Sequence, residues 1–192
     1  MLCKLERFLT GRRIPISIVV FSTFVLLNVF LFHVRPRDLL NWTDPFTVVG
    51  EVLVLIGIAI RAWAAGTIHK STQLTTTGPY GLVRNPLYVG SFLMIFGFFT
   101  LIGEAYASWL LIALLVVMYW LKVRQEEGFL ARKHPQLWPQ YRAAVPRFVP
   151  RRLMIPSLRD WSLGQWLRNH EFEAPLASLF ALAALQAWHI WG

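Results

Sequence analysis

Long apolar runs alternate with short polar or proline-rich segments along the whole chain. A helix needs about 17–25 consecutive, mostly apolar residues to cross a hydrocarbon core of about 30 Å. Runs of that length predict five transmembrane helices, at residues 14–34, 46–66, 86–102, 105–122 and 174–190. The pattern therefore predicts an all-α, polytopic membrane protein, with residues 1–192 forming a single membrane-embedded domain.

The third and fourth predicted helices are separated only by Gly103-Glu104, so we expect them to form an antiparallel helical hairpin. The fourth helix is expected to continue past the membrane to His134, because no helix breaker occurs before Pro135. The Pro, Trp and Arg content of residues 123–172 predicts a layer on the cytoplasmic surface rather than a separate domain.

The hairpin also predicts which polar residues meet. Arg84 lies about 19 residues before the turn and Glu126 about 22 residues after it, and each residue of a helix rises about 1.5 Å. Arg84, Tyr88 and the Glu126-Glu127 pair should therefore lie at one level, with Tyr141–Phe148 folded over them. Polar segments that converge beside an apolar wall suit a site that joins a polar reagent to a lipophilic substrate.

Composition supports a membrane protein, because 56% of the residues are hydrophobic and only 15% are charged. The formal charge of +9 could indicate nucleic-acid binding, but the basic residues flank the predicted spans. The predicted outer loops contain only Arg35 and Arg37 as bases, which favours a cytoplasmic N-terminus and site. We expect an integral protein of a bacterial inner membrane that contacts membrane lipids and binds no nucleic acid.

The sequence does not predict a metal site. Its single cysteine, Cys3, excludes an internal disulfide and a cysteine-based metal site. Four histidines show no spacing typical of metal ligands, namely His33, His134, His170 and His189.

Several residues near the predicted site also allow structural interpretations. Asn85-Pro86 is a good helix start, with Asn as the cap and Pro in the first turn, although the same helix end would favour a bound carboxylate or phosphate. Arg84 could extend to the headgroups as a membrane anchor. Three residues could be ordinary interfacial aromatics, namely Tyr80, Tyr88 and Tyr141.

Within the predicted spans, a few residues break the apolar pattern. Glu51 and Arg61 are ten residues apart in the second span, about 15 Å along a helix axis, so we expect separate bundle-facing roles. Gly90 and Gly97 are seven residues apart in the third span and are expected to permit close helix packing.

These residues resemble a known family. Gly78–Tyr80 and Arg84–Gly90, followed in order by Glu126–Leu130, Tyr141 and Val145–Phe148, are similar to the isoprenylcysteine carboxyl methyltransferases and related phospholipid methyltransferases. The resemblance covers nearly half of the chain, and the ordered set is more specific than any single piece.

The resemblance implies a cytoplasm-facing pocket for S-adenosylmethionine and a methyl acceptor that enters from the bilayer. Arg84 is then expected to position the acceptor or its negative charge, and Glu127 to act beside it as a second catalytic residue. The positions that the resemblance assigns to cofactor binding are Gln73, Leu74, Gly78, Tyr80, Asn85, Pro86, Tyr88, Glu126, Tyr141, Pro146 and Arg147.

The chain departs from the family pattern at two positions. Asn85 stands where members often have His, and an amide cannot carry a proton at neutral pH, so general-base catalysis from this position is not expected. Ala144 stands where prenylcysteine enzymes tend to have a basic residue, which leaves other lipophilic acceptors open.

The sequence thus predicts a membrane-embedded methyltransferase that uses S-adenosylmethionine to methylate a prenylcysteine-like carboxylate or a lipid headgroup. One alternative is an NADPH-dependent reductase of the sterol-reductase type, with Lys133, Arg142 and Arg147 around the cofactor phosphate. Another is a non-catalytic lipid-binding membrane protein, whose basic surface would simply bind anionic lipid.

Overall fold

The computed structural model describes residues 34–69, 73–103, 106–151 and 159–191, and for 106–111 the backbone only. No strand occurs in these ranges, in agreement with the predicted all-α class. The predicted span 14–34 lies outside them, apart from its last residue. The described elements are α3 (Pro45–Thr67), the 3-10 helix η1 (Gly78–Gly81), α4 (Pro86–Ile102), α5 (Tyr106–Lys133), α6 (Trp138–Ala144), α7 (Leu163–Arg168) and α8 (Glu173–Trp191).

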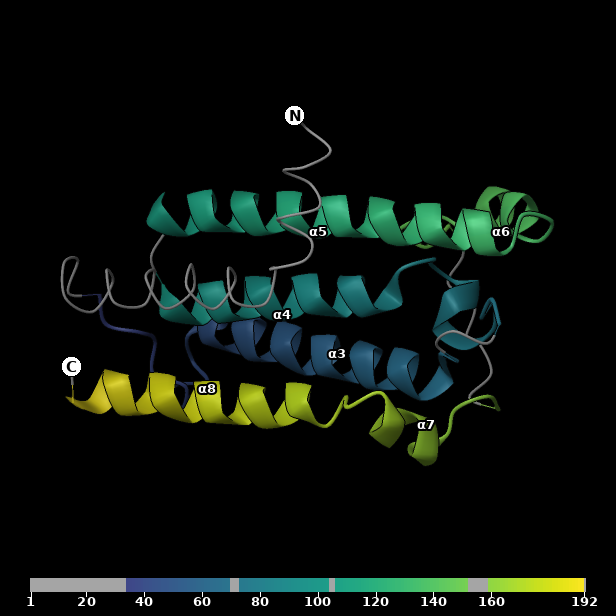
Figure 1. Cartoon of the computed structure of the whole chain (residues 1–192). Helices are drawn as coiled ribbons and strands as arrows, with labels where there is room; N and C mark the ends of the chain where they lie inside the picture. The colour runs from purple at the N-terminus through teal and green to yellow at the C-terminus, as the bar shows by residue number, and fades with distance from the viewer. Residues whose placement is uncertain (1–33, 70–72, 104–105, 152–158, 192) are drawn as a thin grey trace.

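The four long helices lie roughly side by side, and the short helices α6 and α7 gather at one end of the bundle (Figure 1). Of the described helices, α3 and α8 are long and apolar enough to cross a membrane, and α4 is a shorter apolar helix. The larger number of spans stays a prediction. The short helices and their loops lie at one end of the bundle, and the C-terminus lies at the opposite end (Figure 1).

Glycines hold α3 and α4 in close contact. A Cβ atom at Gly90 would lie 2.6 Å from the carbonyl oxygen of Gly57, and one at Gly97 would lie 2.6 Å from that of Gly50. The two glycines of α3 are seven residues apart, and so are the two of α4, so the two backbones meet twice along one face. The packing role expected for Gly90 and Gly97 is confirmed.

The α4–α5 connection has the features of the predicted hairpin. Gly103 ends α4 in the left-handed conformation at φ 84°, which glycine adopts without steric cost. The α5 helix continues to Lys133, and the amide of His134 still donates to the carbonyl of Leu130. The expected extension of this helix beyond the apolar run is confirmed.

A partly buried ion pair joins distant parts of the chain near the C-terminal end of α3. The Arg61 guanidinium binds both carboxylate oxygens of Glu171, at 2.6 and 3.1 Å, and donates to the Ser91 hydroxyl at 2.6 Å. Arg61 therefore faces the bundle, as expected, and connects α3 to α4 and to the segment that leads into α8.

Candidate functional site

The centre of the candidate site is Glu127, a carboxylate near the end of α5 that is only 7% exposed. The Arg147 guanidinium approaches it with two nitrogens, Nη2 at 2.6 Å from Oε2 and Nε at 3.1 Å from Oε1. Asn85 donates from Nδ2 to Oε1 at 3.0 Å, and Arg84 Nε lies 3.6 Å from the same oxygen. Two segments, residues 84–85 and Arg147, thus converge on one carboxylate.

The segment after α6 folds back over the start of α4, as the sequence predicted. The backbone amide of Arg84 donates to the carbonyl oxygen of Pro146 at 2.8 Å. The Tyr141 hydroxyl donates to the carbonyl oxygen of Tyr80 at 2.8 Å, which fastens α6 to η1. These bonds place Arg147 beside Glu127.

Asn85 does not use its side chain as a helix cap. It occupies the N-cap position of α4, but its side chain makes no capping hydrogen bond. Its side-chain Nδ2 donates to Glu127 Oε1, and this bond is charge-assisted because the acceptor is a buried carboxylate. The helix start predicted at Asn85-Pro86 is therefore confirmed, without a capping hydrogen bond from the Asn85 side chain.

Arg84 is buried rather than extended to the headgroups, so the anchor interpretation is also wrong. Its side chain is 9% exposed, and among the described residues its Nε and Nη1 atoms have no hydrogen-bond partner. Burial lowers the pKa of Arg84 and Glu127 raises it, while Arg147 and Arg142 lower it further. Two buried or half-buried guanidinium groups share the Glu127 carboxylate, which leaves an excess of positive charge suited to an anionic group.

Glu126 lies at the rim of the site. The Tyr88 hydroxyl donates to its Oε1 atom at 2.8 Å, and Lys122 Nζ lies 3.6 Å from that atom. The Glu126 side chain is 44% exposed. The two adjacent carboxylates therefore have different environments, and Glu127 is the one inside.

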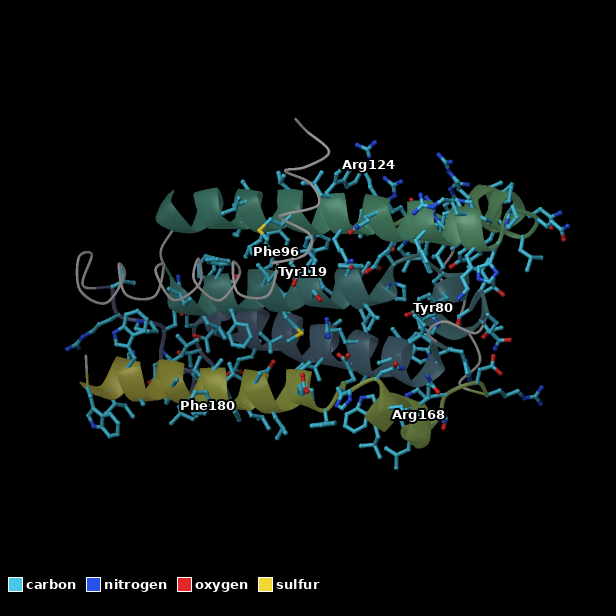
Figure 2. All side chains as sticks on the ribbon, in the orientation of Figure 1. Tyr80, Phe96, Tyr119, Arg124, Arg168 and Phe180 are labelled. Carbon is cyan, nitrogen blue, oxygen red and sulfur yellow. The ribbon has the colours of Figure 1, made fainter. Side chains whose placement is uncertain are left out.

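Aromatic rings form an apolar wall between α4 and α5 next to these charges. Tyr119 packs against both Tyr88 and Phe92, with ring centres 5.5 Å apart, and Figure 2 places it on the α4-facing side of α5. Phe148 continues the wall by packing on Phe92 and Trp120. The Arg147 guanidinium lies 4.9 Å from the Trp120 ring centre, so the wall reaches the charged cluster.

Two tyrosine hydroxyls are held in their neutral form near the site. Burial raises the pKa of Tyr80 and, together with Glu127, that of Tyr141 against the opposing effect of Arg84. The Tyr80 hydroxyl is a buried atom without a hydrogen-bond partner among the described residues. The Tyr80 hydroxyl is therefore neutral and leaves one hydrogen-bond donor unused among the described residues.

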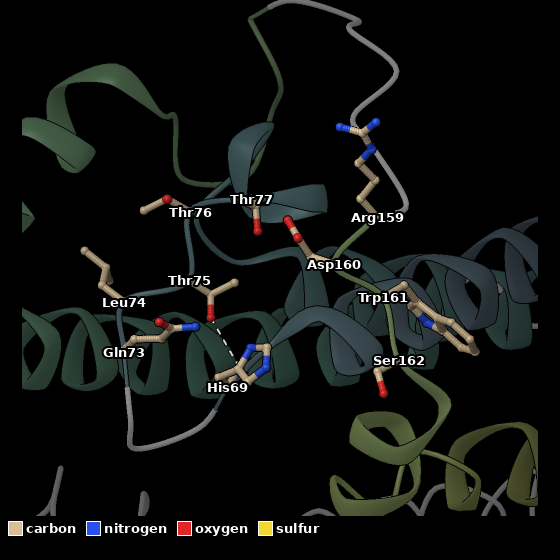
Figure 3. Close-up of a pocket in the computed structure, with 10 residues that line it drawn as sticks. All are labelled: His69, Gln73, Leu74, Thr75, Thr76, Thr77, Arg159, Asp160, Trp161 and Ser162. Atoms are coloured by element: carbon tan, nitrogen blue, oxygen red, sulfur yellow. Dashed lines mark hydrogen bonds between the residues drawn. The ribbon is translucent and has the colours of Figure 1, made fainter.

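Other predicted cofactor residues border a separate hollow of about 460 Å³ beyond the end of α3 (Figure 3). Leu74 lies between the hollow and the site, because it lines the hollow and also packs against the buried cluster that contains Tyr141. Gly78, at φ 56°, lies against Thr67, and Pro86 is buried at the start of α4. The residues that line the hollow are His69, Gln73, Leu74, Thr75, Thr76, Thr77, Arg159, Asp160, Trp161 and Ser162.

Residues 159–162 form one wall of the hollow and were not predicted from the sequence. Those residues lie outside the stretch that carries the family resemblance, and no motif or periodicity indicated them. Within the described part of the chain, no three His, Cys, Asp or Glu residues are grouped as a metal site would need.

Comparison with known proteins gives an independent view of the chain. The family model for phospholipid methyltransferase matches residues 46–136. The cobalt-zinc-cadmium resistance protein CzcN of Cupriavidus metallidurans is 32% identical over 83% of this chain and 73% of that relative. The nickel-cobalt-cadmium resistance protein NccN of Alcaligenes xylosoxydans xylosoxydans is 35% identical over 86% of this chain and 78% of its own.

A more distant relative has a named reaction. The protein-S-isoprenylcysteine O-methyltransferase of Schizosaccharomyces pombe is 29% identical over 65% of this chain and 53% of that enzyme. No solved structure matches the chain.

Proposed function

This chain belongs to the phospholipid methyltransferase family, and on that premise we propose that it is a membrane methyltransferase that uses S-adenosylmethionine to methylate a lipophilic acceptor. The NADPH-dependent reductase is not favoured by this membership. The methyltransferase in Schizosaccharomyces pombe supports the reaction class, and its name does not fix the acceptor of this chain.

The observation that carries the proposal is the excess positive charge at Arg84. A buried cation with unpartnered donors is costly unless an anionic group pairs with it. Both S-adenosylmethionine, through its carboxylate, and an acidic lipid acceptor can supply that group. The residues present therefore fit the proposed cofactor and its reaction partner.

The surrounding residues suit distinct tasks. Glu127 holds Arg84 and Arg147 in place, and the Tyr80 hydroxyl and Asn85 offer neutral polar contacts. The aromatic wall that includes Tyr119 would receive the hydrocarbon part of an acceptor from the bilayer. The cofactor would supply an activated methyl group, so the protein's own contribution is alignment and exclusion of water.

Ligand binding to the detergent-purified protein tests the proposal. We expect S-adenosylmethionine and S-adenosylhomocysteine to raise the unfolding temperature, and NADPH to leave it unchanged. Stabilisation by NADPH alone would overturn the proposal in favour of the reductase. No response to either ligand would favour a non-catalytic lipid-binding protein.

A matched pair of variants tests the role of Arg84. We expect Arg84→Ala to weaken cofactor binding or turnover by about tenfold or more, because hydrogen bonds to charged groups contribute about 1.5–3 kcal/mol. Arg124→Ala is the control, since Arg124 is exposed on α5 and points away from the bundle (Figure 2). Equal behaviour of the two variants, both inserted in the membrane, would remove Arg84 from the site.

A further inference from the structure

The C-terminal end of α3 leaves backbone carbonyls that need donors, and the segment 161–169 supplies them. The Trp161 indole donates to the carbonyl of Ala62 at 3.1 Å, and the amide of Ser162 donates to that of Gly66 at 2.9 Å. Further along, Gln165 and Asn169 donate their side-chain amides to carbonyls of the same helix end. These bonds fix residues 161–169 on α3, and the donors to Ala65, Gly66 and Ile68 satisfy carbonyls at or just beyond the helix end that lack partners of their own.

The Trp161 anchor requires a residue without a side chain opposite it. A Cβ atom at Gly66 would collide with the Trp161 indole ring. The ring therefore lies directly on the α3 backbone, and Asp160 and Ser162 on either side of it are held at the edge of the hollow. This wall is built by packing and hydrogen bonds rather than by chance contact of a loop.

Across the hollow lies a segment rich in hydroxyl groups. Thr75, Thr76 and Thr77 line the hollow together with Asp160 and Ser162, and Thr77 is the one that lies beside Asp160 (Figure 3). The amide of His69 donates to the Thr75 hydroxyl at 3.2 Å, which holds that side of the hollow in shape. Asp160 is exposed, and no described side chain forms an ion pair with it.

We propose that Asp160 binds the cofactor, with the wall 159–162 closing the side of the cofactor site opposite residues 73–77. Its carboxylate accepts hydrogen bonds from a donor-bearing part of S-adenosylmethionine, either the ribose hydroxyls or the α-ammonium group. This assignment rests on the proposed function and extends it to a segment beyond residues 46–136, the part that matches the family model.

Size and charge agree with such a ligand. The hollow of about 460 Å³ lies within the range of roughly 300–1,000 Å³ that is usual for cofactor and small-molecule sites. Carboxylates commonly accept hydrogen bonds from ribose hydroxyls in nucleotide sites, and S-adenosylmethionine carries a sulfonium and an ammonium group that favour an acidic neighbour. Leu74 lines the hollow and also packs against the buried cluster that contains Tyr141, so the hollow is a neighbour of the Arg84–Glu127 site.

Titration of the full-length, detergent-purified protein with S-adenosylhomocysteine tests the proposal. We expect Asp160→Asn to weaken binding by about tenfold, as the loss of a charge-assisted hydrogen bond implies. Glu173→Gln is the matched control, because it removes one exposed carboxylate at the start of α8 outside the hollow. Gly66→Ala, which displaces Trp161, should weaken binding as well without touching any acidic group.

A second ligand identifies the group that Asp160 contacts. Methylthioadenosine keeps the ribose hydroxyls and lacks the ammonium group. A tenfold loss with both ligands in Asp160→Asn supports the ribose contact, and a loss confined to S-adenosylhomocysteine supports the ammonium contact. Unchanged binding of S-adenosylhomocysteine in Asp160→Asn overturns the inference alone, whereas absence of binding in the wild type overturns the proposed function and this inference together.

Discussion

At the scale of single residues, Glu127 decides the electrostatics of the site. We expect Glu127→Gln to lower the free energy of unfolding by about 2 kcal/mol, because it keeps the shape and removes the charge that pairs with Arg84 and Arg147. A broken buried ion pair typically costs roughly 3–5 kcal/mol, and we expect a smaller loss here because Arg147 is partly exposed. Denaturant unfolding in detergent measures the change, and cofactor binding should fall with it.

The neighbouring carboxylate is the control for this prediction. Glu126→Gln keeps an acceptor for the Tyr88 hydroxyl and changes a side chain that is 44% exposed. We expect its effect on unfolding to stay below about 1 kcal/mol, as for surface ion pairs. Equal losses in the two variants would contradict the distinct environments of the two glutamates.

Tyr141 gives a prediction for pH. Burial, aided by Glu127, raises the pKa of its hydroxyl in the folded protein, while an unfolded tyrosine ionises near pH 10. The unfolded state therefore loses a proton first, and this residue's contribution makes unfolding easier as the pH rises above about 10, by up to about 1.4 kcal/mol per pH unit. In Tyr141→Phe that part of the slope should disappear between pH 9 and 11. An unchanged slope would contradict a buried, neutral Tyr141 hydroxyl.

At the scale of helices, the glycine contacts between α3 and α4 set their separation. We expect Gly97→Ala to lower the free energy of unfolding by about 1–3 kcal/mol, because the added methyl group meets the backbone oxygen of Gly50, which cannot rotate away. Gly128→Ala on α5 is the control, since its added Cβ atom meets only the end of the flexible Arg132 side chain at 3.7 Å. That variant should be neutral or more stable by about 0.5–1 kcal/mol. A harmless Gly97→Ala would mean that the helices are farther apart.

The hairpin shows what the sequence can predict at this scale. The constant rise of a helix and a short turn are enough to bring Arg84 and Tyr88 level with Glu126 and Glu127, and their contacts agree. The same reasoning could not tell which of the two glutamates accepts from Asn85, because adjacent helical residues point about 100° apart and the choice depends on the rotation of α5.

Contacts that span the chain were beyond prediction for a different reason. Arg61 was expected to face the bundle, but its partner Glu171 lies 110 residues away and carries no periodic signal. The wall around Asp160 is held by backbone carbonyls near the end of α3. Every residue has such a carbonyl whatever its side chain, so the sequence gives no signal for these bonds. Such positions can be identified only from the hydrogen bonds that the folded backbone forms.

At the scale of the whole molecule, the distribution of charge predicts its orientation in the membrane. The end of the bundle with α6 and α7 carries exposed bases such as Arg132 and Arg142. Leu40 marks the opposite end, beside α8, because the amide of the preceding Leu39 donates to Gln186 of that helix. Basic residues favour the cytoplasmic side, so the candidate site should face the cytoplasm.

Cysteine accessibility measures this orientation, because the chain contains only one native cysteine, Cys3. In a Cys3→Ser background we expect a membrane-impermeant maleimide to label Leu40→Cys in intact cells, since that side chain is 76% exposed. Gln136→Cys, exposed between α5 and α6, should react only after the membrane is disrupted. The reverse pattern would place the Arg84–Glu127 cluster outside, away from the cytoplasmic supply of S-adenosylmethionine, and would contradict the proposed function at its most general level.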